Sequence, residues 1–359
     1  MKTMIKNENK LYYWPSAFCI DDDEIWFIYG KLCLLCKYTI STKINKIIGV
    51  VPVDNPMKEN LFQKVILVEN KLFLIPCWAN DIVVYDLKKD KFKVIKIKPQ
   101  RGFKFSGAYI FKDEIVCMPA SYEYVVGINI YDLTINYEYS VKKIKEQDHI
   151  DYFNTTDKLE EQKIVLCSPQ TGKIYCYDIE KQILESKKIY QEKCGNKFEF
   201  VLCIDNQIVL CDNKRHEIVI YNYGTEQIEN IFWPLGKNLV AVFRLDDKII
   251  IDDYETSWVG IYNKKFKLLA EVKDSITKNR KYYYSYLVGS CESNCGEKIY
   301  FNNCDMSFNW IYNGLPKEKV RLLLSETDRE YIKKNLFMCK NIEKENYYYR
   351  LKDYLENIL

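Results

Sequence analysis

The chain contains two histidines, His149 and His216, and both fall in predicted loops. His149 lies between two of the segments that repeat along the chain, and His216 lies between two strands of one such segment. In a ring of repeats these two classes of loop open on the same face, so both imidazoles could approach one funnel. Imidazole changes its charge near neutral pH and is the commonest general acid or base. Both histidines are therefore candidate catalytic residues, although a histidine in a surface loop is usually inert.

Acidic residues and one arginine extend this candidate catalytic set. Asp252 and Asp253 follow a predicted second strand, and Arg101 lies in a connecting loop. Paired carboxylates at a funnel mouth could serve a glycosidase-type mechanism. Acidic residues at strand ends equally often cap a turn by accepting hydrogen bonds from their own backbone. If the protein is an enzyme, the set predicted to carry its chemistry is Arg101, His149, His216, Asp252 and Asp253.

The loops predicted to share this face are rich in aromatic and cationic side chains, which suit the binding of sugars, peptides or anionic groups. From the loops between second and third strands come Trp78, Tyr122, Tyr124, Arg215, His216, Tyr254 and Trp258. From the loops between repeats come Arg101, Tyr152, Arg280 and Tyr283. Aromatic residues make up 15% of the chain, so packing of several of these rings between repeats is an equal alternative.

The sequence predicts neither a metal site nor a cofactor. Cys33 and Cys36 have a zinc-like spacing, but in a strand their side chains would point to opposite faces. Cys291, Cys295 and Cys304 lie around a turn without a nearby histidine, whereas structural zinc normally takes four ligands. No glycine-rich phosphate loop and no serine elbow occurs in the sequence.

Composition narrows the class of protein. The chain has 359 residues, 53 basic and 50 acidic side chains, and a formal net charge of +3, which argues against a dedicated nucleic-acid binder. It has no apolar run of membrane-spanning length and no signal-peptide pattern at its start. The 14 cysteines fall mostly in strand-like runs. We therefore expect a cytoplasmic protein with reduced thiols and no membrane contact.

A repeat organises the chain. A charged or amide residue followed by a short apolar run recurs about seven times, and a second run ending in tyrosine plus a small polar residue follows each occurrence. The tyrosines are separated by 47, 46, 46, 44, 41 and 50 residues. They are Tyr38, Tyr85, Tyr131, Tyr177, Tyr221, Tyr262 and Tyr312. A fixed period of this length is the signature of a repeat array.

Each unit is predicted to form four short antiparallel strands joined by turns. In the second repeat the predicted strands are 65–68, 71–76, 81–85 and 91–97. In the third they are 108–111, 114–119, 126–131 and 137–141.

The inner strands are apolar at consecutive positions, as at Ile82, Val83 and Val84. Side chains alternate between the faces of a strand, so both faces must be covered. Helices on both sides of a parallel sheet would cover them, but no helical segment of ten or more residues is predicted between Phe62 and Leu324. One or two β-sandwiches are a further alternative. Radially arranged sheets also cover both faces, and the period favours them. The predicted fold is all-β: a seven-bladed β-propeller with four-stranded antiparallel blades.

The predicted domain boundaries follow from this reading. Residues 1–324 form the propeller, and residues 325–359 form a C-terminal α-helical cap. Seven blades are favoured, with six or eight as alternatives. The blades are expected at about 14–51, 62–98, 105–142, 150–190, 197–232, 238–273 and 284–324.

The repeat unit resembles a divergent kelch repeat. The resemblance rests on Ile82 to Asp86, on Phe92, on Arg101, and on Ser106 to Ala108 leading into Glu114 to Pro119. The double glycine that typically ends the second kelch strand is absent, and sequences such as Met118-Pro119 stand there. Kelch-like propellers include both partner-binding scaffolds and enzymes, so the resemblance implies a fold without choosing an activity.

The two ends of the chain have patterns of their own. Thr327 and Glu330 form a capping box, and apolar residues at helical spacing follow. The segment is expected to pack on the propeller, or alternatively to dock a partner or a second copy. Residues Asn7 to Trp14 are expected to add an edge strand to the last blade and so latch the ring.

Three functional hypotheses remain open on the sequence. The favoured one is a non-catalytic scaffold whose loop face binds a peptide, protein or glycan. The second is a carbohydrate-active propeller enzyme of lyase, hydrolase or epimerase type. The third is a structural subunit that assembles through its C-terminal helices.

Overall fold

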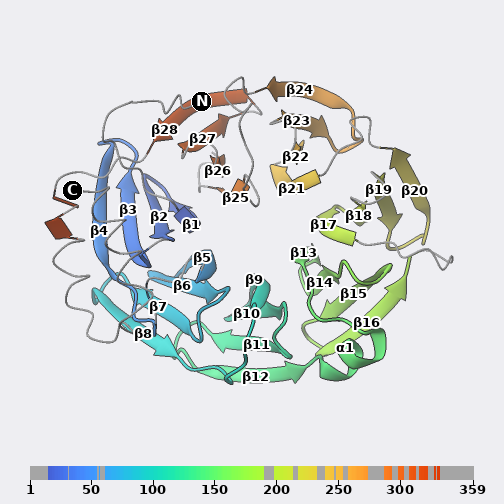
Figure 1. Cartoon of the computed structure of the whole chain (residues 1–359), viewed down its shortest axis with the longest axis horizontal. Helices are drawn as coiled ribbons and strands as arrows, with labels where there is room; N and C mark the ends of the chain where they lie inside the picture. The colour runs from blue at the N-terminus through green and yellow to red at the C-terminus, as the bar shows by residue number, and fades with distance from the viewer. Residues whose placement is uncertain are drawn as a thin grey trace, which may run out of the picture.

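The protein is a ring of four-stranded antiparallel sheets (Figure 1). The computed structural model describes residues 15–30, 32–54, 56, 61–189, 198–212, 217–232, 239–245, 248–253, 258–273, 287–292, 298–302, 307–312, 315–321, 327–328 and 330–331. Within these residues the strands form seven sheets, each made of four strands consecutive in the sequence, and we call them blades 1 to 7. The predicted all-β propeller is confirmed, and the number of sheets is the one that the sequence favours.

The strands take four positions in their blades. The first strands are β1 (Pro15–Asp21), β5 (Phe62–Val68), β9 (Phe105–Phe111), β13 (Thr155–Glu160), β17 (Phe198–Ile204), β21 (Leu239–Leu245) and β25 (Leu287–Glu292). The second strands are β2 (Glu24–Tyr29), β6 (Lys71–Pro76), β10 (Glu114–Pro119), β14 (Lys163–Cys167), β18 (Gln207–Asp212), β22 (Lys248–Asp253) and β26 (Lys298–Asn302). The third strands are β3 (Leu34–Thr39), β7 (Ile82–Asp86), β11 (Tyr124–Asn129), β15 (Lys173–Asp178), β19 (Glu217–Asn222), β23 (Trp258–Asn263) and β27 (Ser307–Tyr312). The fourth strands are β4 (Ile44–Val50), β8 (Lys91–Ile95), β12 (Ile135–Ser140), β16 (Ile183–Lys188), β20 (Ile228–Phe232), β24 (Leu268–Lys273) and β28 (Leu315–Arg321).

The first strands surround the axis of the ring, and the fourth strands form its circumference (Figure 1). Each first strand contacts the first strands of its two neighbours, and β1 contacts both β5 and β25. The ring therefore closes between blades 7 and 1 through direct contact of their first strands. The predicted latch by residues Asn7 to Trp14 lies outside the described residues.

The core lies between the blades, and consecutive side chains of one strand serve different neighbours. In β6 every residue from Leu72 to Pro76 is buried. Leu72 and Leu74 pack with residues of blade 1, whereas Phe73 and Ile75 pack with residues of blade 3. Burial of each such side chain contributes about 1.5–3 kcal/mol. Sibling sheets thus cover both faces of the strand, as its unbroken apolar sequence requires.

The small polar residue that ends most third strands caps the turn into the fourth strand. Asp86 Oδ1 accepts hydrogen bonds from the backbone N–H groups of Lys88 (3.1 Å) and Lys89 (3.0 Å). Asn222 and Asn263 accept backbone N–H groups of their own turns in the same way. The repeated polar residue therefore reflects turn chemistry, which Asp and Asn favour because their side chains bond their own backbone.

The third repeat is predicted in the wrong register. Its third strand is β11, Tyr124–Asn129, where the sequence predicts 126–131. Ile128 lies opposite Ile115 in the sheet, at the position that tyrosine takes in other blades. Tyr131 lies in the turn with 57% of its surface exposed, and Asn129 caps that turn. The prediction failed because a tyrosine followed by an aspartate recurs by chance three residues downstream, and the apolar pattern alone could not separate the two registers.

A short helix, α1 (Lys142–Asp148), lies between blades 3 and 4, where the sequence predicts a loop. It is shorter than the ten residues excluded there and leaves the all-β assignment intact. Buried Val141 precedes it, and His149 ends it in the left-handed conformation at φ 54°. No helix in the described part of the chain has the length and apolar character needed to cross a membrane.

The described part of the predicted C-terminal cap is helical and lies beside blade 1. Residues 327, 328, 330 and 331 have helical conformation (Figure 1, dark red). Asp328 is buried, and its charge adds to burial in raising the pKa of the Cys36 thiol in β3. The rest of the predicted cap lies outside the described residues, so its packing on the propeller stays a prediction.

Gly127 in β11 gives a test of the packing between strands. A Cβ there would overlap the Tyr137 ring, whose Cζ atom would lie 2.6 Å away. We expect Gly127→Ala to lower the free energy of unfolding by about 1–3 kcal/mol, because overpacking forces the half-buried ring of Tyr137 to move. Chemical denaturation under reducing conditions measures the change. Gly224→Ala is the matched control, since its nearest contact would be at 3.7 Å, and it should change stability by less than about 0.5 kcal/mol. Equal stability of the two variants would contradict the packing described here.

Candidate functional site

Three loops of blades 2 and 3 meet on the face predicted to carry the site. They are the loop from β6 to β7, the loop from β8 to β9, and the loop from β10 to β11. Lys104 N–H donates to Cys77 O at 2.7 Å, and Ala120 N–H donates to Lys104 O at 2.8 Å. Ser121 N–H donates to Phe103 O at 2.8 Å. Backbone hydrogen bonds therefore join the three loops into one surface.

Trp78 and Phe103 form a stacked aromatic pair on this surface. Their ring centroids are 6.1 Å apart, and their planes are inclined by 23°. Trp78 keeps 42% of its surface exposed although it is a large apolar residue. Gly102 precedes Phe103 at φ 99°, a conformation that favours glycine, and it allows the chain to turn between exposed Arg101 and the aromatic pair. An indole and a guanidinium are thus held on adjoining loops.

Two polar side chains fix the loop that carries Arg101. The Gln100 side chain donates to Ser121 O and accepts from Glu123 N–H, both at 3.0 Å. Lys104 is almost fully buried, and its ammonium donates to the Gln100 carbonyl. These bonds hold the loop between β8 and β9 against the loop between β10 and β11. The surface is therefore preorganised, which lowers the entropic cost of binding a ligand.

Most other cations of this loop already have carboxylate partners. Lys96 pairs with Asp81 at 2.6 Å, and Lys98 pairs with Glu138 at 2.5 Å. The hydrogen bond to each carboxylate raises the pKa of its lysine. Lys98 also lies 4.1 Å from the centre of the Tyr124 ring. Among the residues that the structure describes, it shows no carboxylate partner for Arg101.

The other predicted aromatic residues of this face differ in exposure. Tyr122 is buried, and its ring packs edge-on against Phe105 at 5.4 Å and against Tyr124 at 5.6 Å. Burial raises the pKa of its phenol. Tyr122 therefore follows the packing alternative rather than lining an open site. Tyr152 is half-buried, and burial followed by the charges of Glu199 and Asp151 raises its pKa.

The predicted catalytic residues are only partly described. His149 is exposed at the end of α1. Asp252 and Asp253 lie in β22, and Trp258 lies opposite Asp253 at the loop end of β23. The remaining predicted residues lie outside the described part of the chain: Arg215, His216, Tyr254, Arg280 and Tyr283. The structure therefore brings Trp78 and Arg101 onto one surface and leaves the proposed histidine pair untested. No group of three or more His, Cys, Asp or Glu residues in the described ranges is placed to hold a metal ion.

Lys145 of α1 is a notable residue that the sequence analysis missed. It is 7% exposed, and its ammonium donates to the carbonyls of Ala120, Tyr122 (3.1 Å) and Asp151 (3.5 Å). Burial lowers its pKa to about 8, and the charges of Glu123 and Asp151 oppose the shift. Lys145 thus fastens α1 to the loop of blade 3. A single lysine in a charged stretch, Lys142 to Glu146, gives no sequence signal that only one side chain turns inward.

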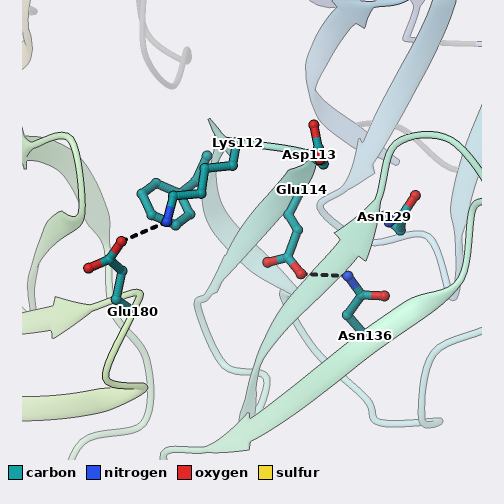
Figure 2. A pocket seen from close by; sticks show the side chains of 7 residues that line it. Lys112, Asp113, Glu114, Asn129, Asn136 and Glu180 are labelled. Carbon is teal, nitrogen blue, oxygen red and sulfur yellow. Dashed lines mark hydrogen bonds and ion pairs between the residues drawn. The ribbon is translucent and has the colours of Figure 1, made fainter.

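The opposite face carries a groove between blades 3 and 4 that the sequence analysis also missed (Figure 2). Its volume is about 530 Å³, and turns between first and second strands and between third and fourth strands form its walls. The lining residues are Phe111, Lys112, Asp113, Glu114, Asn129, Asn136 and Glu180. They come from two blades, and no spacing in the sequence brings Glu180 near Lys112.

Comparisons with known proteins support the fold and no particular family. No family model matches the chain, and no curated protein matches it. A streptogramin B lyase structure superposes with a TM-score of 0.59 at 14% identity, covering 83% of this chain and 94% of that one. A catalytically inactive virginiamycin B lyase from Staphylococcus aureus with quinupristin gives 0.61 at 12% identity, covering 84% and 94%. A chain of the mitotic checkpoint complex gives 0.58 at 6% identity, covering 90% and 94%.

These neighbours are β-propellers, and at such low identity they show the fold alone. They include a lyase as well as a chain from a protein complex, so they do not choose between catalysis and binding. The finer assignment of the repeat as kelch-like stays a prediction from the sequence.

The depressed pKa of Lys145 predicts a pH dependence of stability. The folded pKa is about 8 and the unfolded pKa is about 10.4. Between these values the unfolded chain binds the proton more tightly, so the contribution of Lys145 to stability rises with pH. We expect the unfolding free energy of the wild type to increase by about 1–3 kcal/mol relative to that of Lys145→Met between pH 7.5 and pH 10.

Denaturant titrations of both proteins across this pH range measure the effect. Titratable groups that both proteins contain contribute equally to the two unfolding free energies, so their contributions cancel in the difference. Lys142→Met is the control, because Lys142 lies on the same helix with 56% of its side chain exposed. A difference for Lys145→Met that stays constant with pH would show that the buried ammonium has an ordinary pKa.

Proposed function

We propose that the protein is a binding scaffold that recognises a peptide segment of a partner protein on the loop face of blades 2 and 3. The observation that carries the proposal is the exposed Trp78–Phe103 stack beside Arg101, on loops held in place by backbone and side-chain hydrogen bonds. Tryptophan and arginine are the residues most often found to dominate the energy of protein interfaces.

The chemistry of this surface also suggests the kind of segment that it binds. A stacked indole and phenyl ring offer a flat apolar platform for an aromatic or aliphatic side chain. The guanidinium of Arg101 can form a bidentate hydrogen-bonded pair with a carboxylate. An apolar residue near an acidic one therefore matches both features. A glycan carrying a carboxylate would use the same groups, and the experiment below separates the two.

A carbohydrate-active enzyme remains the alternative from the sequence. It would use Arg101, His149, His216, Asp252 and Asp253. The lyases among the structural neighbours share the fold with this chain, and their identities of 12–14% carry no catalytic residue over to it. Of the two histidines, His149 lies among the described residues. Its imidazole is exposed, and the structure describes no catalytic partner for it among these residues. The binding function is therefore the one that the described surface supports best.

Selection from a random peptide library tests the proposal. Peptides selected on the wild-type protein should lose affinity by at least about tenfold for Trp78→Ala and for Arg101→Ala, since dominant interface residues contribute about 2 kcal/mol or more. Affinities are measured by fluorescence anisotropy with labelled peptides. A glycan array is probed in parallel with the wild type and the same variants. Binding to glycans but to no peptide would identify the ligand as a glycan.

Tyr131→Ala is the matched control, because Tyr131 is an exposed aromatic residue on the opposite face of the ring. It should leave the affinity of the selected peptides unchanged. Peptides that bind Trp78→Ala as tightly as they bind the wild type would place the binding surface elsewhere.

A further inference from the structure

The groove between blades 3 and 4 lies on the face opposite the Trp78 surface, so it is independent of the function proposed above. Blade 3 supplies Lys112 and Asp113 from its first turn, Glu114 from the start of β10, and Asn129 and Asn136 from the ends of β11 and β12 beside its last turn. Blade 4 supplies Glu180 from the turn between β15 and β16. The groove is thus a concave surface with a volume of about 530 Å³, which is within the range of ligand pockets.

A cationic group of the chain itself already lies at this groove. Lys112 Nζ reaches across from blade 3 to Glu180 Oε1 of blade 4 at 2.7 Å (Figure 2). The ammonium also lies 4.9 Å from the centre of the Phe111 ring. Its side chain is 65% exposed and that of Glu180 is 48% exposed, so the pair is screened by water and contributes little to stability. An external cation can therefore replace Lys112 on Glu180 without disturbing the fold.

Three carboxylates line the groove, those of Asp113, Glu114 and Glu180, and Glu114 has no cation of its own among the described residues. Asn136 Nδ2 donates to Glu114 Oε1 at 2.5 Å and fixes the direction of the carboxylate (Figure 2). Behind Glu114 lies the packed interface of the two blades. Burial raises the pKa of Tyr137 there, and the charge of Glu114 raises it further. A carboxylate beside this apolar interface attracts cations more strongly than one surrounded by water.

We propose that this groove binds an arginine side chain of a partner protein, with the guanidinium held by Glu114 and Glu180 and with Lys112 displaced. Glu114 and Glu180 line the same groove, where the exposed ammonium of Lys112 now pairs with Glu180, and the five N–H donors of a guanidinium allow it to bond more than one carboxylate. The Phe111 ring offers the guanidinium the same cation–π contact that it now makes with Lys112. The amide groups of Asn129 and Asn136 line the remaining space, where the peptide backbone of the partner would continue.

Isothermal titration calorimetry of the whole chain with Nα-acetyl-arginine methylamide at low ionic strength tests the proposal. The wild type should bind this probe and should not bind its neutral citrulline counterpart. Glu114→Gln should weaken binding by about fivefold or more, which is the effect of losing about 1 kcal/mol. Lys112→Met should strengthen binding by about threefold to fivefold, because it removes the internal competitor.

Two variants of α1 control for the general effect of charge. Glu146→Gln and Lys142→Met make the same changes of charge at exposed positions on the other face of the ring, and each should alter the affinity by less than about twofold. The proposal is overturned if the probe does not bind, if citrulline binds equally well, or if Lys112→Met leaves the affinity unchanged. A loss of affinity in Glu146→Gln as large as that in Glu114→Gln would also overturn it, because attraction to the net charge would then explain binding.

Discussion

The structure depends on the burial of consecutive side chains of one strand against two different neighbouring sheets. In β14, Ile164 and Leu166 pack in the cluster shared with blade 3, whereas Val165 and Cys167 pack in the cluster shared with blade 5. A blade on its own would expose one of these faces to water. Each sheet is therefore stable only between two others, and the condition is met for every blade when the row closes into a ring. The contact of β1 with β25 closes that ring.

Hydrogen bonds also join the first strands of neighbouring blades. Lys64 of β5 donates to Ala108 O of β9 at 2.7 Å, and Tyr109 of β9 shares a hydrogen bond with Thr156 of β13 at 2.9 Å. Cys203 N–H of β17 donates to Asp157 Oδ2 at 2.6 Å. Burial lowers the pKa of Lys64, and the charge of Asp157 opposes this shift. Because hydrogen bonds are directional, these contacts fix how far one blade slides past the next, which apolar packing alone specifies less strictly.

The two faces of the ring differ in what they can carry. On one face, loops between strands and between blades vary in length and contain α1, the Trp78–Phe103 stack and Arg101. On the other face, short turns capped by Asp and Asn bring charged side chains of neighbouring blades together, as at Lys112 and Glu180. Long loops supply a shaped aromatic surface, whereas tight turns supply charge at fixed positions. The two faces therefore present chemically different surfaces.

The sequence predicted the repeat and the strands because these depend on local patterns. The charged or amide residue that opens each second strand and the unbroken apolar run after it were sufficient to predict sheets covered on both sides. The same local patterns gave the wrong strand bounds at β11. Either Ile128 or Tyr131 could take the position that tyrosine takes in other blades, and only the pairing of Ile128 with Ile115 decides between them. It also gave no sign that Tyr122 is buried while Trp78 is exposed, since both are aromatic residues in equivalent loops.

Only the tertiary structure decided which charged residues meet. Lys145 and Lys142 are indistinguishable in the sequence, yet one is enclosed by three carbonyl groups and the other is exposed. The groove depends on Glu180, which lies 68 residues from Lys112 in the chain. Periodicity is a property of neighbouring residues and is visible in the sequence. A site between blades depends on how two separate repeats dock, and docking is fixed by the packing of the assembled ring.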